Sequence, residues 1–208
     1  EPDVQDAAPG VITIDAKRGF SQRALSVGRP LLVTKAYGQG VAALSVHNSY
    51  NFGALWYDIE PLAEAGLIAF AYVNSRSFVA PAGGTKPVFG TNPMAFACPR
   101  ANHPPLVMDS APAAIARGEL QLHARDGRPI PDGWGLDPAG QPRRDAKAVL
   151  AGAQLPFGGH KGSAIALMVE LLAAGLTGGN FAFEASTEYR IGKNDGGPSH
   201  TGEPVAAI

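Results

Sequence analysis

The chain has little cysteine, little charge and no long apolar segment. Cys98 is the single cysteine in 208 residues, so no disulfide can form within the chain, and we expect a cytosolic setting. No block of Lys or Arg occurs and the net charge is −1, which argues against nucleic acid or anionic membrane as a partner. The acidic first residues lack the apolar region of a signal peptide. The longest apolar stretch, 164–176, is interrupted by Glu170 and is too short to span a bilayer.

Motifs for metal binding and for a serine nucleophile are also missing. The five histidines show no metal-ligand spacing, and neither His-Glu-x-x-His nor a cysteine pair is present, so we expect no metal. No Gly-x-Ser-x-Gly nucleophile elbow occurs. Cys98 lies in the apolar run 94–98 and is expected to be a small buried residue rather than a nucleophile.

Glycine and proline are abundant, at 26 and 18 residues, and this predicts many turns between short elements. The 45% hydrophobic content suits one large or two small globular domains. Ser21 could cap a helix that Gly28-Arg29-Pro30 should interrupt or kink. Further helices are predicted at 54–65, 115–125, 145–150 and 164–176, and strands at 41–46, 67–73, 94–98 and 106–108. These elements predict a mixed α and β fold.

Residues 38–43 match Gly-x-Gly-x-x-Ala, the glycine pattern of many dinucleotide-binding proteins. Here the pattern leaves a predicted helix and enters a predicted strand. The Rossmann fingerprint needs the reverse order, so this match does not indicate a Rossmann domain.

The segment 155–163 carries three glycines, His160 and Lys161 where a loop becomes a helix. A helix N-terminus offers unpaired N–H groups and partial positive charge, so the segment could bind an anion or a phosphate. Its spacing is not that of the P-loop. An ordinary glycine-rich turn before a core helix explains the same residues.

Other polar positions also have two interpretations. The loop 81–93, which contains Thr91 and Asn92, is long enough to be functional, or is a turn before Pro93. The loop 48–53 follows a predicted strand and could hold a ligand, or simply cap a helix. Glu119 and His123 share a helix face and could pair, although a solvated helix face explains the same residues and is the favoured interpretation.

Five segments, taken in order, resemble the malate/L-lactate dehydrogenase family of non-Rossmann oxidoreductases, and within it the cyclic imine reductases. These segments are Phe52-Gly53-Ala54-Leu55-Trp56, Ala80-Pro81-Ala82-Gly83-Gly84, Phe89-Gly90-Thr91-Asn92-Pro93, Asp109-Ser110-Ala111 and Phe157-Gly158-Gly159-His160-Lys161-Gly162. His160 favours the reductases of Δ1-piperideine-2-carboxylate and Δ1-pyrroline-2-carboxylate, because malate-type members usually have tyrosine there. A 2-hydroxyacid dehydrogenase acting on malate, lactate or ureidoglycolate, or an inactive dinucleotide-binding fragment, is the alternative.

The resemblance implies an α/β (α+β) fold whose mixed, largely antiparallel sheet has flanking helices. It also implies NADPH as cofactor, with NADH possible, a small 2-imino or 2-oxo acid as substrate, and a homodimer. The division it suggests is 1–40 as lead-in and helix, 41–184 as cofactor-binding and catalytic core, and 185–208 as a partial return segment.

The resemblance also assigns roles to individual residues. Glu119 takes the place of the family's charge-relay aspartate, while Thr91 and His160 would contact the substrate. The residues expected to line the cofactor are Asn51, Phe52, Gly53, Ala54, Leu55, Asp109, Ser110, Ala111, Lys161 and Gly162. Asn51 stands where histidine is usual, and the family's upstream Ser-His-Gly motif, with its catalytic histidine, does not occur in this sequence.

Overall fold

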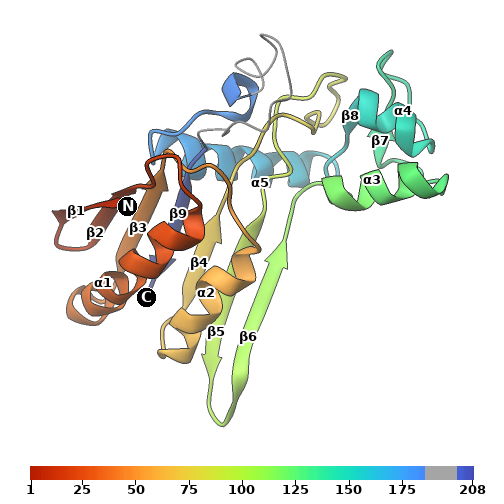
Figure 1. The fold of residues 1–208 in the computed structure, drawn as a ribbon. Helices are drawn as coiled ribbons and strands as arrows, with labels where there is room; N and C mark the ends of the chain where they lie inside the picture. Colours follow the sequence, from red (N-terminus) through yellow and green to blue (C-terminus); the bar gives the residue numbers. More distant parts are fainter. Residues whose placement is uncertain (186–200) are drawn as a thin grey trace.

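A seven-stranded sheet forms the centre of the computed structural model, which describes residues 1–185 and 201–208 (Figure 1). The strand order is β1-β2-β3-β9-β4-β5-β6, and every neighbouring pair is antiparallel except β2–β3. The strands are β1 Asp3–Ala8, β2 Val11–Asp15, β3 Ala42–His47, β4 Ala69–Tyr72, β5 Met94–Arg100, β6 His103–Ser110 and β9 Glu203–Ala207. The predicted mixed, largely antiparallel sheet is confirmed.

Two helices cover one face of this sheet, α1 (Ser21–Gln39) over β2 and β3 and α2 (Leu55–Glu64) over β4 and β5 (Figure 1). The strands contribute alternate residues to the interface, as the two-residue period of a half-buried strand requires. In β3, for example, Ala42, Leu44 and Val46 are buried while the residues between them are not. This interface is the main hydrophobic core.

The structure contradicts two parts of the prediction for α1, the cap at Ser21 and an interruption at Gly28-Arg29-Pro30, while a kink there stays a prediction. Ser21 does not cap the helix, because Phe20 is the N-cap residue and makes no side-chain cap bond. The helix also continues through Pro30. Pro30 is exposed, so the carbonyl that loses its N–H partner can be solvated. Gly28 packs so closely on the sheet that a Cβ there would lie 2.3 Å from Leu44 Cδ1, and we infer that this packing holds the helix together.

A smaller lobe lies beside the sheet (Figure 1). It contains α3 (Arg117–Asp126), β7 (Gly135–Leu136), α4 (Ala146–Ala151) and β8 (Ala153–Gln154). Its own small core includes Leu120, Ile130 and Val149. Helix α5 (His160–Glu170) extends from this lobe towards the sheet and runs into the π-helical turn η1 (Leu171–Gly175). The predicted helix 164–176 therefore began four residues late.

Both ends of the described chain contribute strands to the same sheet. Residues 1–40 supply β1, β2 and α1, and residues 203–207 form β9, which lies between β3 and β4. Neither β2 nor β9 was predicted from the sequence, and part of the predicted return segment, 186–200, falls outside the described residues. Cys98, expected to be buried, is half-buried in β5. No helix within the described ranges is long and apolar enough to cross a membrane.

Candidate cofactor and substrate site

The loop that leads into α2 is held from both sides. Ser21 N–H donates to the Asn51 carbonyl at 3.0 Å, and a Cβ on Gly53 would lie 2.3 Å from Gln22 Nε2. On the other side, Trp56 N–H in the first turn of α2 donates to Asp109 Oδ2 at 3.0 Å. The predicted cofactor segments 51–55 and 109–111 therefore lie together. Leu55 is only 1% exposed and packs in the core, so of these residues it has the least surface to offer a ligand.

The segment after Asp109 leads directly to the glycine-rich turn. Ser110 ends β6 opposite Met94, and Ala111 follows it. The next residue, Pro112, accepts a bond from Phe157 N–H at 2.8 Å. This backbone bond connects the glycine-rich turn to the 109–111 segment, and the Asp109 side chain connects that segment in turn to the start of α2.

The glycine-rich turn has an open backbone where α5 begins. Gly158 and Gly159 have φ of +56° and +61°, which only glycine adopts readily, and a Cβ on either would have no neighbour closer than 3.9 Å. His160 and Lys161 form the exposed start of the helix. Gly162 differs, because a Cβ there would lie 2.3 Å from the Phe157 carbonyl oxygen. Gly162 thus allows the turn to pack tightly. Gly158 and Gly159 leave space for an anion to approach the backbone, and Lys161 supplies a positive charge.

The loop that carries Thr91 is attached to the same helix. Ala82 N–H donates to Ser163 Oγ at 2.8 Å, and Asn92 Nδ2 donates to the Ala166 carbonyl at 2.9 Å. Thr91 is half-buried between these attachments. Helix α5 therefore brings the predicted substrate loop near the predicted cofactor segments.

Glu119 is an exposed residue in the first turn of α3. Its Oε1 lies 3.4 Å from His123 Nε2 and 3.8 Å from Arg128 Nη2, so the pairing with His123 that the helix spacing allowed is present. Two residues earlier, Arg117 stacks 4.4 Å from the centre of the Phe78 ring, and Phe78 N–H donates to the Phe89 carbonyl at 2.8 Å. The start of α3 is thus tied to the loop that contains Thr91.

Burial and the nearby Arg76 lower the pKa of Arg117. A guanidinium loses solvation on burial and is repelled by a second cation, so both effects act against its charged form. An anionic group bound beside Arg76 and Arg117 would be stabilised by their two positive charges. Arg117 also donates a hydrogen bond to the Leu150 carbonyl at 3.1 Å.

Two residues near the site were not identified from sequence. Glu170 is buried in α5 and Asn74 is buried after β4, and Asn74 Nδ2 donates to Glu170 Oε2 at 3.0 Å. The available signal was a lone carboxylate inside the apolar run 164–176, since a buried charge needs partners.

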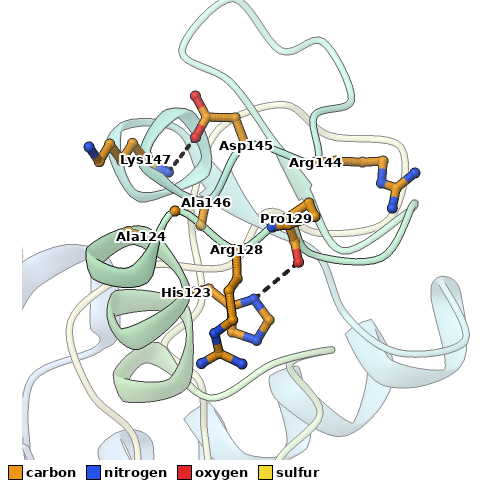
Figure 2. Close-up of a pocket in the computed structure, with 9 residues that line it drawn as sticks. His123, Ala124, Arg128, Pro129, Arg144, Asp145, Ala146 and Lys147 are labelled. Atoms are coloured by element: carbon orange, nitrogen blue, oxygen red, sulfur yellow. Dashed lines mark hydrogen bonds between the residues drawn. The ribbon is translucent and has the colours of Figure 1, made fainter.

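A cavity of about 490 Å³ lies elsewhere, between α3 and α4 (Figure 2). None of the predicted site residues lines it. Two of its charged side chains have partners: Arg128 pairs with Asp126 at 3.5 Å, and Asp145 accepts from the Lys147 backbone N–H at 3.0 Å. Figure 2 shows His123 Nδ1 directed at the Pro129 carbonyl, 3.1 Å away. The cavity adjoins Glu119 only through His123 and Arg128.

The chain matches the malate/L-lactate dehydrogenase family over residues 1–208 and belongs to it. Similar curated proteins include Δ1-pyrroline-2-carboxylate/Δ1-piperideine-2-carboxylate reductases from Pseudomonas putida, 55% identical over 184 residues, and Pseudomonas aeruginosa, 57% identical over 178 residues. These alignments cover 88% and 86% of this chain and 54% and 53% of the relatives. The resemblance inferred from the five segments is confirmed.

Solved structures agree in fold. A Δ1-piperideine-2-carboxylate reductase from Pseudomonas syringae superimposes with a TM-score of 0.94 at 49% identity, covering all of this chain and 62% of that one. A putative malate/lactate dehydrogenase from E. coli gives 0.88 at 30% identity, covering all of this chain and 58% of that one. The chain thus spans about half to three-fifths of the length of these relatives.

Proposed function

We propose that the protein containing this chain reduces small cyclic 2-imino acids, Δ1-piperideine-2-carboxylate and Δ1-pyrroline-2-carboxylate, to pipecolate and proline. The observation that carries the proposal is the 55–57% identity to reductases named for these two substrates. The contacts that gather the predicted site segments around α5 support it.

A nicotinamide cofactor, NADPH rather than NADH, is part of the proposal. When bound it would supply a hydride to C2 of the imine. The open backbone at Gly158 and Gly159 and the Lys161 ammonium fit one of its phosphate groups, since a helix N-terminus and a cation both favour an anion. Residues 51–55 and 109–111, joined by the bond from Trp56 N–H to Asp109, would line the rest of the cofactor.

The remaining assignments concern the substrate and the proton. Thr91 would hold the substrate carboxylate or its surroundings, and His160 would approach the ring. Glu119 would stabilise a protonated partner through its carboxylate, as it already lies beside His123 and Arg128. The homodimer and the cytosolic setting belong to the same proposal, and analytical ultracentrifugation and fractionation would test them.

The direct test is NADPH oxidation by the purified protein, with Δ1-piperideine-2-carboxylate compared with pyruvate and oxaloacetate. We expect a much higher kcat/KM for the imine. Faster turnover of the oxo acids would instead favour a 2-hydroxyacid dehydrogenase. NADH in parallel assays tests the cofactor preference.

The same assay should be run on the 208-residue chain alone and on the chain together with any residues its gene encodes on either side. We expect little or no activity from the 208 residues alone, because they lack the Ser-His-Gly motif. Substantial imine reduction by these 208 residues would contradict that expectation. Tight NADPH binding without turnover by the longer protein would support a non-catalytic module instead.

A further inference from the structure

Glu170 is a buried carboxylate that connects three separate parts of the chain. Its side chain is 3% exposed, on the last turn of α5 before the π-helical turn. Four N–H groups donate to its two oxygens: Asn74 Nδ2 at 3.0 Å, Asn92 Nδ2 at 2.9 Å, Gly90 N at 3.3 Å and Ala182 N at 3.0 Å. No cation is needed in such an arrangement, because charge-assisted amide bonds are among the stronger hydrogen bonds.

The two oxygens serve different segments. Oε2 accepts from Asn74 and Ala182, whereas Oε1 accepts from Gly90 and Asn92. Gly90 and Asn92 are the two chain neighbours of Thr91. The Oε1 atom therefore holds both neighbours of the residue proposed to contact the substrate, Gly90 through its backbone N–H and Asn92 through its side-chain amide.

The backbone at Asn92 depends on this support. Asn92 has φ of +53°, an uncommon conformation for a residue other than glycine. Its side chain is fully buried and also donates to the Ala166 carbonyl at 2.9 Å. A strained residue of this kind persists only where its surroundings fix it, and here Glu170 and the α5 backbone do so.

A Cβ on Gly90 would lie 2.5 Å from both Asn92 Oδ1 and Ser75 Oγ, so this side of Thr91 is also tightly packed. Helix α5 carries Glu170 at one end and Lys161 near the other, nine residues or about 14 Å apart along the axis. One rigid helix therefore sets the position of the Thr91 loop relative to the proposed cofactor residues.

We infer that Glu170 is a positioning residue for the reaction: its Oε1 fixes the Gly90–Asn92 backbone and so holds Thr91 in place for the carboxylate of a cyclic imino acid. The inference rests on the proposed function. In this proposal Glu170 does not touch the substrate and acts only through Thr91. Its effect on the reaction can still be large, because displacement of a substrate-holding group by about 1 Å can lower the rate substantially.

The first test is a double-mutant cycle in the full-length protein with Glu170→Gln and Thr91→Ala. In Glu170→Gln an NH2 group replaces one acceptor oxygen and faces an N–H donor. We expect the KM for Δ1-piperideine-2-carboxylate to rise about tenfold, with the KM for NADPH changed less than about twofold. In the Thr91→Ala background the same substitution should change kcat/KM by about twofold or less, since coupled residues are non-additive.

The second test separates the two oxygens and covers the case in which Glu170→Gln fails to fold. Asn92→Gly removes a donor to Oε1 and tolerates the positive φ, whereas Asn74→Ala removes a donor to Oε2. We expect only Asn92→Gly to raise the KM for the imine. Glu184→Gln is the matched control, because Glu184 is an exposed carboxylate that accepts from Phe181 N–H at 2.9 Å, and its kinetics should stay as in the wild type.

The outcomes are distinguishable. Additive effects of Glu170→Gln and Thr91→Ala on kcat/KM would overturn the inference. Equal effects of Asn92→Gly and Asn74→Ala on the KM for the imine would also overturn it. In either case the proposed function stands as long as the wild-type protein reduces the imine. A full-length wild type that does not reduce the imine overturns both.

Discussion

At the scale of single residues, Asp109 connects the end of β6 to the start of α2 across 53 positions of sequence. Helix N-termini leave their first N–H groups without intrahelical partners, and Asp109 satisfies the one on Trp56. Ala54, the N-cap residue of α2, has no side chain that could do so. The same carboxylate is expected to line the cofactor, so its structural role and its proposed functional role coincide.

Asp109→Ala should therefore destabilise the fold by about 1 kcal/mol, the usual effect of losing a helix cap. Asp109→Asn should cost less, because the amide oxygen still accepts from Trp56 N–H. Urea unfolding followed by circular dichroism measures both. Equal stability of Asp109→Ala and the wild type would show that the bond contributes nothing.

Asp58 and Glu203 form a buried acidic pair beneath α1 and α2. Both residues are 2% exposed, and among the residues that the structure describes none donates a hydrogen bond to their four carboxyl oxygens. Burial raises the pKa of Asp58 to about 6, and repulsion from Asp109 acts in the same direction. A hydrogen bond with a protonated Glu203 and the charge of Arg29, 4.0 Å away, act to lower the pKa. Burial and the charge of Asp58 raise the pKa of Glu203 well above its ordinary value, although Ser21 and Arg29 oppose this. A proton on one carboxyl would supply the missing donor between the two.

This pair predicts a specific pH dependence of stability. The folded pKa of Asp58, about 6, exceeds its ordinary value of 3.8, so the folded state binds more protons between these values and loses stability as the pH rises through them. Asp58→Asn removes the titration. We expect the variant to be more stable than the wild type by on the order of 1–3 kcal/mol at neutral pH, with the difference shrinking towards pH about 4.

Urea unfolding of both proteins across this pH range tests the prediction, and Glu64→Gln provides an exposed carboxylate on the same helix as the control. A stability difference between Asp58→Asn and the wild type that does not vary with pH would refute the prediction.

At the scale of elements, glycines 118 and 162 offer a matched comparison. A Cβ on Gly162 would meet the Phe157 carbonyl at 2.3 Å, whereas one on Gly118 in α3 would meet nothing within 4 Å. Gly162→Ala should destabilise the protein by about 1–3 kcal/mol through overpacking. Gly118→Ala should be neutral or stabilise it by up to about 1 kcal/mol, because alanine is the better helix former. Thermal unfolding compares the two, and a harmless Gly162→Ala would mean that the turn before α5 adjusts freely.

The elements that sequence predicted correctly are those whose patterns are local. Strand β3 and helix α2 were identified from a buried apolar run and from Gly66, which has φ of +85° just past the helix end. Strand β9 is specified instead by pairing with β3 and β4, more than 130 residues away in sequence, which no local pattern contains. The bonds from Gly90 and Asn92 to Glu170 also join positions far apart in sequence, and this is why the sequence suggested a role for Thr91 but did not indicate the residue that supports it.

At the scale of the whole molecule, the position of β9 makes the sheet depend on its last strand. Backbone bonds from β9 to β3 and β4 join the strands β1-β2-β3 to the strands β4-β5-β6. Val205 and Ala207 also belong to the main core. Residues 1–8, in contrast, contain only the edge strand β1, which pairs with β2 alone.

Deleting residues 203–208 should therefore abolish cooperative unfolding, because it exposes two unpaired strand edges and opens the core between them. Deleting residues 1–8 should lower the midpoint of thermal unfolding but leave a single transition, since one edge strand is lost and the core remains covered. Far-ultraviolet and near-ultraviolet circular dichroism during heating distinguish the two results. A cooperative transition that survives the loss of residues 203–208 would show that the strands β1-β2-β3 and β4-β5-β6 hold together through α1 and α2 without the central strand.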